Sequence, residues 1–238
     1  MSGHVAVLDM DGTLLPGTLG TDYLDALLAV GLADRTSARA AIDAVARYRD
    51  GQLALADAAP QIYGHYARAL RGTPVGAAHE VAFRVWQRAR PRLFPFVADL
   101  LDALAAAGYR TVLISGSPHE VIEHAAADLD VHAAQGVVAD HDGHHHTGTL
   151  SLVPGLPGGK HRALRALVRQ LPATPGKSDR KKWFAIGNSS SDAEVLTQVG
   201  RPLAFEPDPQ LAHLAALHAW PVADRDNLLP VLLDTLRG

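Results

Sequence analysis

The sequence predicts an α/β fold in which a doubly wound parallel sheet is interrupted by an inserted all-helical segment. Three observations lead to this prediction. A short, continuous apolar run at residues 5–8 is typical of a buried central strand. Strands and helices then alternate from about residue 95 onward, which favours a parallel sheet covered on both faces. Between these regions, residues 19–90 show only helical periodicity.

The helical segment is rich in Ala and Leu and is predicted to contain four short helices. The breaks between them fall at Gly31, Gly51, Gly72 and Pro74. Pro60 lies inside one predicted helix, where a proline lacks the N–H that the helix needs. We therefore expect a kink or a helix boundary there.

The elements after the insert are predicted from apolar periodicity and from turn residues. A hairpin turn is expected at residues 140–143, with its return strand at 147–149. The other predicted strands are 109–114, 131–138, 183–186, 202–205 and one near Pro221. The predicted helices are 96–107, 120–129, 158–170, 192–199 and 210–219.

The composition indicates a globular protein whose partner is a small molecule. Hydrophobic residues make up 47% and charged residues 20% of the 238 positions, which excludes disordered and fibrous classes. The net charge of -3 gives no general attraction to nucleic acid or to an anionic membrane. The absence of cysteine excludes disulfides and thiolate metal sites. No signal peptide or membrane span is recognisable, so we expect a cytoplasmic protein, with its oligomeric state left open.

The strongest functional signal is the sequence Asp-Met-Asp-Gly-Thr at residues 9–13, directly after the predicted buried strand. Ligands of open α/β sheets bind beyond the carboxyl ends of the strands, so Asp9 and Asp11 are expected to face that crevice. There Asp9 would attack a phosphoryl group, while Asp11 would protonate the leaving oxygen and later activate water. Two adjacent carboxylates repel each other, and Mg²⁺ suits such hard oxygen ligands. A simple polar turn is the alternative interpretation.

Three further segments are predicted to reach the same edge of the sheet. Ser115 and the amide of Gly116 lie between a strand and a helix N-terminus, where phosphates bind. Lys160, at the start of a helix, would neutralise phosphate charge and keep the nucleophile ionised. The segment 187–192 supplies two oxygen-bearing side chains for a metal. Taken alone, these segments are also typical of a turn, a solvated lysine and a helix N-cap.

The order of these segments resembles the four motifs of the haloacid dehalogenase superfamily. The motifs stand here as Asp-Met-Asp-Gly-Thr at 9–13, Ser115-Gly116, Lys160, and Gly187-Asn188 with Asp192. The chain is most similar to the phosphoserine-phosphatase-like branch, in which a helical cap follows the first motif. Residues 207–211 and 219–222 also resemble the C-terminal end of that branch. The likeness covers the whole core, whereas the cap resembles the branch only in position and helical character.

The resemblance implies a division of the chain and a role for each motif residue. Residues 1–15 and 93–238 would form a Rossmann-like catalytic core, and residues 16–92 would form the cap. Asp9 would be the nucleophile and Asp11 the general acid and base. The phosphate would be bound by Thr13, Ser115, Gly116 and the catalytic Lys160. Mg²⁺ would be held by Asp9, the backbone carbonyl of Asp11 and Asn188, with Asp192 supporting these ligands.

Two positions depart from the pattern of the family. Position 188 is usually Asp, and Asn188 keeps an oxygen ligand but removes a negative charge, which predicts weaker Mg²⁺ binding. Thr18 stands where phosphoserine phosphatases have the glutamate that receives the substrate amino group, so phosphoserine is not the default substrate. The arginine that would bind a substrate carboxylate is not identifiable among Arg47, Arg49, Arg68, Arg71, Arg84 and Arg88.

Three other features receive structural interpretations. The His-rich segment 141–146 invites a metal site, but adjacent side chains on a hairpin point to alternate sides, so we interpret it as a polar turn. The basic segment Lys177–Lys182 is predicted to be a solvated loop. Trp86, Trp183 and Trp220 are predicted to pack in the core or the cap, with Trp86 the candidate for the substrate entrance.

Together these features predict a Mg²⁺-dependent phosphatase that acts on a small phosphorylated metabolite. The phosphomonoester would be hydrolysed through an aspartyl-phosphate on Asp9. A phosphoryl transferase or mutase on the same site remains an alternative, and Asn188 also leaves open a catalytically silent phosphate-binding module. Dehalogenation is disfavoured, because a halide leaving group needs no proton from Asp11.

Overall fold

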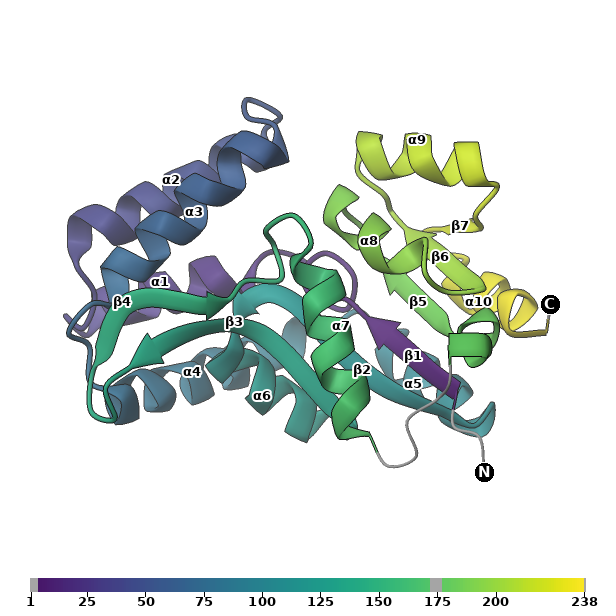
Figure 1. The fold of residues 1–238 in the computed structure, drawn as a ribbon, viewed down its shortest axis with the longest axis horizontal. Coiled ribbons are helices and arrows are strands. Elements are labelled where there is room, and N and C mark those ends of the chain that lie inside the picture. The colour runs from purple at the N-terminus through teal and green to yellow at the C-terminus, as the bar shows by residue number, and fades with distance from the viewer. Residues whose placement is uncertain (1–3, 172–176, 238) are drawn as a thin grey trace.

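The computed structural model describes residues 4–171 and 177–237 and has the predicted α/β architecture (Figure 1). Its seven-stranded sheet has the order β4-β3-β2-β1-β5-β6-β7. All neighbouring strands are parallel except β3 and β4, which form an antiparallel hairpin. The strands are β1 His4–Leu8, β2 Tyr109–Pro118, β3 Ala133–His141, β4 His146–Leu152, β5 Phe184–Gly187, β6 Arg201–Phe205 and β7 Val222–Ala223.

Helices cover both faces of the sheet, as a doubly wound fold requires. Alternate residues of β1 pack on opposite faces, with Ala6 and Leu8 in one hydrophobic cluster and Val5 and Val7 in another. The first cluster includes residues of α5 (Val97–Ala106), α6 (His119–Asp128) and α10 (Leu228–Arg237). The second includes residues of α7 (Gly159–Gln170), α8 (Ala193–Leu196) and α9 (Pro209–His218). The predicted fold class is therefore confirmed.

The inserted segment contains the four predicted helices between β1 and α5. They are α1 Leu19–Ala29, α2 Arg35–Arg49, α3 Leu55–Leu70 and α4 Val75–Ala89. Pro60 does not end a helix, because α3 continues through it. The side chain of Gln61 donates a hydrogen bond to the carbonyl of Asp57 in the same stretch, at 2.9 Å.

The β3–β4 hairpin is joined to the insert by backbone hydrogen bonds. The amide of Gly72 donates to the carbonyl of His146 at 2.8 Å, and the amide of His146 donates to the carbonyl of Thr73 at 3.0 Å. Val75 likewise donates to the carbonyl of His144 at 2.9 Å. In Figure 1 the hairpin extends from the sheet between α3 and α4. The predicted boundary between insert and core, at residue 92, assigns this hairpin to the core. The hairpin is nevertheless hydrogen-bonded to the segment between α3 and α4 of the insert.

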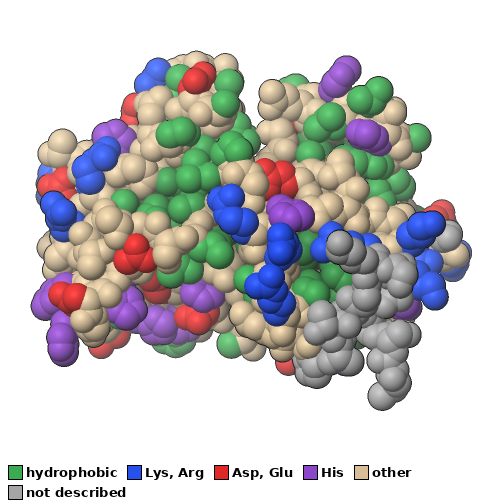
Figure 2. Space-filling model, viewed as in Figure 1, with side chains coloured by type: hydrophobic (Ala, Val, Ile, Leu, Met, Phe, Trp, Pro, Cys, Tyr) green, Lys and Arg blue, Asp and Glu red, His purple; other side chains and the backbone are tan. Residues whose placement is uncertain are grey.

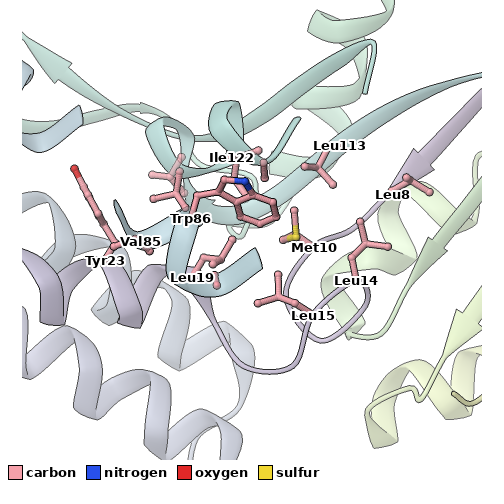
Figure 3. Close-up of a cluster of buried hydrophobic side chains, with 14 of the residues drawn as sticks. Leu8, Met10, Leu14, Leu15, Leu19, Tyr23, Val85, Trp86, Leu113 and Ile122 are labelled. Carbon is pink, nitrogen blue, oxygen red and sulfur yellow. The ribbon is translucent and has the colours of Figure 1, made fainter. Parts of the chain in front are cut away.

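One hydrophobic cluster connects the sheet with the insert (Figure 3). It includes Leu8 at the end of β1, Leu113 on β2 and Trp86 on α4. Trp86 is only 1% exposed, which confirms its predicted packing in the core or the cap and shows that the alternative place at the substrate entrance is wrong. Trp183 is buried in the cluster on the other face, and Trp220 packs against that cluster from its edge, so core packing is confirmed for both.

Several element boundaries differ from the prediction. β2 continues through Pro118 instead of ending at residue 114, with an irregular register against β3 between Ile114 and Pro118. The predicted helix 192–199 is a 3₁₀ turn, Ser190–Asp192, followed by the short α8. Lys177–Lys182 is a 3₁₀ helix and not a loop. Helix α10 has no counterpart in the sequence prediction. Residues 172–176, between α7 and this 3₁₀ helix, lie outside the described residues.

The His-rich segment forms the turn between β3 and β4. The carboxylate of Asp142 accepts hydrogen bonds from the amides of His144 and His145, at 2.8 and 2.7 Å. Within the described residues, no group of three or more His, Cys, Asp or Glu side chains is arranged to hold a metal. Nor does any helix among residues 4–171 and 177–237 combine the length and apolarity needed to cross a membrane.

Candidate active site

The first motif forms a tight turn directly after β1, at the carboxyl edge of the sheet. The amides of Thr13 and Leu14 both donate to the carbonyl of Met10, at 3.1 and 2.9 Å. Gly12 has a φ of +83°, and a Cβ atom there would lie 2.1 Å from Nδ2 of Asn188. A glycine is therefore required at this position, because it lets the fourth motif approach the first.

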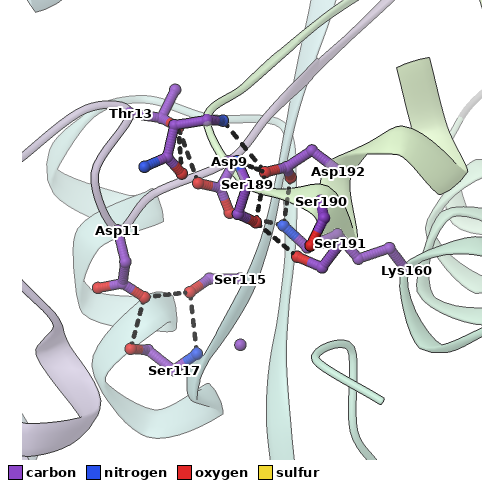
Figure 4. A network of polar contacts seen from close by, with 12 residues as sticks. Asp9, Asp11, Thr13, Ser115, Ser117, Lys160, Ser189, Ser190, Ser191 and Asp192 are labelled. Atoms are coloured by element: carbon purple, nitrogen blue, oxygen red, sulfur yellow. Dashed lines mark hydrogen bonds and ion pairs between the residues drawn. The ribbon is translucent and has the colours of Figure 1, made fainter. Parts of the chain in front are cut away.

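Asp9 is buried at the centre of the site, with only 6% of the residue exposed. Its Oδ1 accepts a hydrogen bond from Nζ of Lys160 at 2.7 Å, and its Oδ2 accepts one from the hydroxyl of Thr13 at 2.8 Å. Nζ of Lys160 also contacts Oδ1 of Asp192. Figure 4 shows these side chains converging from β1, α7 and the turn after β5. The lysine thus bridges two buried carboxylates that come from different motifs.

Burial and the neighbouring opposite charge shift the pKa values of Asp9 and Lys160 in opposite directions. Burial and the negative charge of Asp192 raise the pKa of Asp9 to about 7, although Lys160 lowers it. Burial alone would lower the pKa of Lys160, but the two carboxylates outweigh it and hold that pKa above the ordinary value. The lysine is therefore a permanent cation, and its charge is what keeps an ionised Asp9 tolerable in this buried position.

Asp11 points to the second motif. Its Oδ2 accepts hydrogen bonds from the hydroxyls of Ser115 and Ser117, at 2.9 and 2.7 Å, and its Oδ1 accepts one from the amide of Leu19 at 2.7 Å. Burial raises the pKa of Asp11, although these three hydrogen bonds lower it. Ser117 is not among the predicted site residues, although its position two residues after Ser115 on a strand places both side chains on the same face.

The fourth motif is held by its own capping interactions. Oδ2 of Asp192 accepts hydrogen bonds from the amides of Asn188 and Ser189, at 3.1 and 2.9 Å, and from the hydroxyl of Ser189 at 2.9 Å. The helix N-cap interpretation therefore describes this segment correctly, yet Asp192 also contacts Lys160. Oδ1 of Asn188 lies 3.5 Å from the hydroxyl of Thr13, at the edge of hydrogen-bond distance.

A cavity of about 810 Å³ opens above these residues, between the insert and the carboxyl edge of the sheet. Asp9, Asp11, Lys160 and Asn188 line its floor. Figure 2 shows the hollow between the insert and the part of the chain that carries α8 and α9, with hydrophobic side chains on the insert side. The cavity coincides with the predicted site.

Tyr63 is the main residue of the site that sequence reasoning missed. It lies on α3, and its hydroxyl donates to the carbonyl of Gly116 at 3.2 Å. A Cβ atom at Gly116 or Gly155 would lie 2.6 or 1.8 Å from this hydroxyl, so both glycines make room for it. No local pattern distinguishes Tyr63 from the other aromatic residues of the insert. Its contact with Gly116 arises only because the insert packs on the second motif.

The structure brings the predicted site residues together at one end of the sheet. The first group is Asp9, Thr13, Lys160, Asn188 and Asp192, and the second is Asp11, Ser115 and Gly116. All four motifs therefore meet around one cavity.

The fold and this site define an α/β protein with paired carboxylates and a buried lysine beyond the strand ends. The chain belongs to the family of haloacid dehalogenase-like hydrolases, whose model matches residues 6–197. The resemblance inferred from the four motifs is therefore confirmed.

The curated relatives of the chain include one phosphoserine phosphatase. The chain is 28% identical over 146 residues to phosphoserine phosphatase SerB1 of Mycobacterium tuberculosis, covering 60% of this chain and 42% of the relative. The chain spans less than half the length of the curated relatives it matches.

Solved structures show the same fold. A Bordetella pertussis protein of unknown function has a TM-score of 0.71 at 26% identity, covering 94% of this chain and 100% of the other. A phosphoserine phosphatase studied as a phospho-aspartyl intermediate analogue has a TM-score of 0.62 at 14% identity, with 94% of each chain covered. At that identity, the second likeness concerns the fold alone.

Proposed function

We propose that this protein is a Mg²⁺-dependent phosphatase that hydrolyses a small organic phosphomonoester through an aspartyl-phosphate on Asp9. The observation that carries the proposal is the Asp9 carboxylate, held by Lys160 on one oxygen and by Thr13 on the other, at the floor of the cavity. The relative from Mycobacterium tuberculosis is a phosphoserine phosphatase, and phosphoryl transfer to an aspartate has a structural analogue in the phosphatase of the same fold.

In this mechanism Asp9 is the nucleophile, and Asp11 is the general acid and then the general base. A carboxylate oxygen of Asp9 forms a bond to phosphorus while the bond to the ester oxygen breaks. The departing oxygen takes the proton of Asp11, and Asp11 then takes a proton from the water that attacks the aspartyl-phosphate. This water attack releases inorganic phosphate and restores Asp9. The raised pKa of the buried Asp11 favours the protonated form that the first step needs.

The phosphate would be bound by groups around Asp9. These are the hydroxyls of Thr13 and Ser115, the amide of Gly116 and the ammonium of Lys160. The lysine keeps its charge throughout, because the neighbouring carboxylates hold its pKa high. A fixed cation stabilises the negative charge of the transferring phosphoryl group without having to gain or lose a proton.

The donor atoms at the site fit Mg²⁺, which prefers oxygen ligands. The hydroxyl of Thr13 lies 2.8 Å from Oδ2 of Asp9 and 3.5 Å from Oδ1 of Asn188, so the two side chains present oxygens to the same region. With the backbone carbonyl of Asp11, they would hold the metal, and Asp192 would hold Asn188 in place through its amide. A bound Mg²⁺ would supply positive charge to the phosphate.

Asn188→Asp is expected to tighten metal activation. The change adds a negative charge to the proposed ligand set, and the affinity of such sites follows ligand charge. Titration of phosphate release with Mg²⁺ should reach half-saturation at a concentration lower by about tenfold. An unchanged titration curve would show that Asn188 is not a ligand. Asn227→Asp, in the turn before α10, is the matched control.

Phosphate release from a small panel of phosphomonoesters, with Mg²⁺ and with a chelator, tests the proposal. We expect metal-dependent release from at least one ester. If added acceptor alcohols divert the phosphoryl group into new esters, the protein is a transferase or mutase. If the esters bind but none is turned over at saturating Mg²⁺, the protein is a silent phosphate-binding module.

A further inference from the structure

We propose that the leaving group of the substrate is uncharged and largely apolar, such as an alkyl or prenyl-like alcohol. This inference rests on the proposed phosphatase function and names the substrate class for the same cavity. The cavity of about 810 Å³ is lined by residues of α1, α2 and α3 as well as by the polar groups around Asp9, so it has room for the leaving group.

The insert wall of the cavity is formed by aliphatic side chains. Leu24 comes from α1, Val45 from α2, Ile62 from α3, and Leu53 and Leu55 from the α2–α3 connection and the start of α3. These residues come from four consecutive segments, so the apolar surface is continuous along the insert. A polar leaving group placed against it would lose its water without gaining hydrogen bonds.

Hydroxyl groups on the same wall already have partners within the protein. Tyr63 donates to the carbonyl of Gly116 at 3.2 Å, and Thr21 donates to the carbonyl of Thr18 at 2.8 Å. Tyr63 and Thr21 therefore already donate their hydroxyl hydrogens within the protein, and their aromatic and methyl surfaces add to the apolar wall.

Charged side chains along the cavity are likewise engaged or placed at its mouth. The carboxylate of Glu206 makes two 2.7 Å hydrogen bonds with Arg225, and Asp208 accepts the amides of Ser190 and Leu211, at 2.8 and 2.7 Å. Arg49 and Asp50 also line the cavity, but both are exposed at the end of α2.

Apart from the floor of the site, the described lining therefore offers no buried charge for a substrate amine or carboxylate. Phosphoserine, which carries both groups, fits such a wall poorly. Thr18, in place of the family's glutamate, also lines the cavity and carries no charge. An alkyl chain, in contrast, loses unfavourable contact with water at every methylene that it buries.

The test compares straight-chain alkyl phosphates of two, four, six and eight carbons with phosphoserine. Burial of a methylene predicts a rise in kcat/KM of about twofold to fourfold per carbon, until the chain leaves the cavity. We expect phosphoserine to rank below butyl phosphate. Alkylphosphonates of the same lengths, which cannot be hydrolysed, are titrated by calorimetry and should show a parallel rise in affinity.

Val45→Thr replaces one methyl group of the wall with a hydroxyl at nearly constant shape. It is expected to lower the ratio of octyl to ethyl kcat/KM by about threefold or more. Val30→Thr is the matched control, since Val30 is exposed at the end of α1 and lies outside the cavity lining. The control should keep the ratio of the unmodified protein.

The two assays separate failure of this inference from failure of the proposed function. Turnover without dependence on chain length, or with phosphoserine as the best ester, would overturn the apolar leaving group and leave the phosphatase intact. Phosphonate affinity that rises with chain length, without turnover of any ester, would support the apolar subsite and overturn hydrolysis. Flat phosphonate affinity together with no turnover would overturn both.

Discussion

Asp9→Asn is expected to abolish phosphate release, with a loss of about four orders of magnitude or more in kcat. The amide keeps the size of the side chain but offers no anionic oxygen to attack phosphorus. The fold should tolerate the change, because Lys160 retains Asp192 as an ionic partner and one buried charge is removed. Single-turnover assays with the most active ester of the panel would measure the loss.

Asp99→Asn is the matched control for this variant. Asp99 is exposed in the first turn of α5, and its substitution should leave phosphate release unchanged. Circular dichroism and thermal unfolding of both variants would verify that the folds are intact. Substantial turnover by a folded Asp9→Asn protein would refute the nucleophile assignment and shift the interpretation to direct attack by water.

Lys160→Met is expected to reduce both stability and catalysis. Lys160 is 3% exposed and is hydrogen-bonded to Asp9 and to Asp192, so the substitution leaves two buried carboxylates without their cation. Removing one partner of a buried ionic group costs about 3 to 5 kcal/mol of unfolding free energy. Loss of a charged phosphate ligand should also lower kcat/KM by about a hundredfold or more. Urea unfolding and phosphate release measure the two effects separately.

Lys181→Met is the matched control, because Lys181 is exposed in the 3₁₀ helix before β5. Adding Asp192→Asn to Lys160→Met should recover part of the lost stability, since it removes one of the two buried carboxylates that have lost their cation. It should not recover phosphate release, because the cation is still absent. A Lys160→Met protein as stable as the original would show that the cluster is not held together by this charge.

The local pattern of the sequence was sufficient to predict the core of the site. Asp9 directly follows a strand whose continuous run of apolar residues predicts that the strand is buried. Asp11 comes two positions later in the turn after that strand. Ser115 lies near the carboxyl end of β2, Lys160 lies in the first turn of α7 and Asn188 directly follows β5, and all three are at the same sheet edge. In a parallel sheet, strand ends that are far apart in the chain meet at one edge, so their order predicted their proximity.

Features that depend on long-range packing were not predictable in this way. Tyr63 contacts Gly116 across 53 positions of sequence, and nothing near Tyr63 indicates which face of α3 meets the second motif. For Trp86, the sequence predicted packing in the core or the cap and left the substrate entrance as an alternative. Its burial follows from the packing of α4 against α6.

The sequence by itself therefore determined the doubly wound fold, the family, and which residues of the four motifs share one end of the sheet. Those conclusions rest on periodicity and on residue types at short spacing, which are local properties. Only the tertiary structure decided that Lys160 bridges Asp9 and Asp192, that Ser117 binds Asp11, and that an aliphatic wall faces the site. The direction in which side chains point across an interface depends on how helices of the insert pack on the sheet, and that packing is not encoded in any single segment.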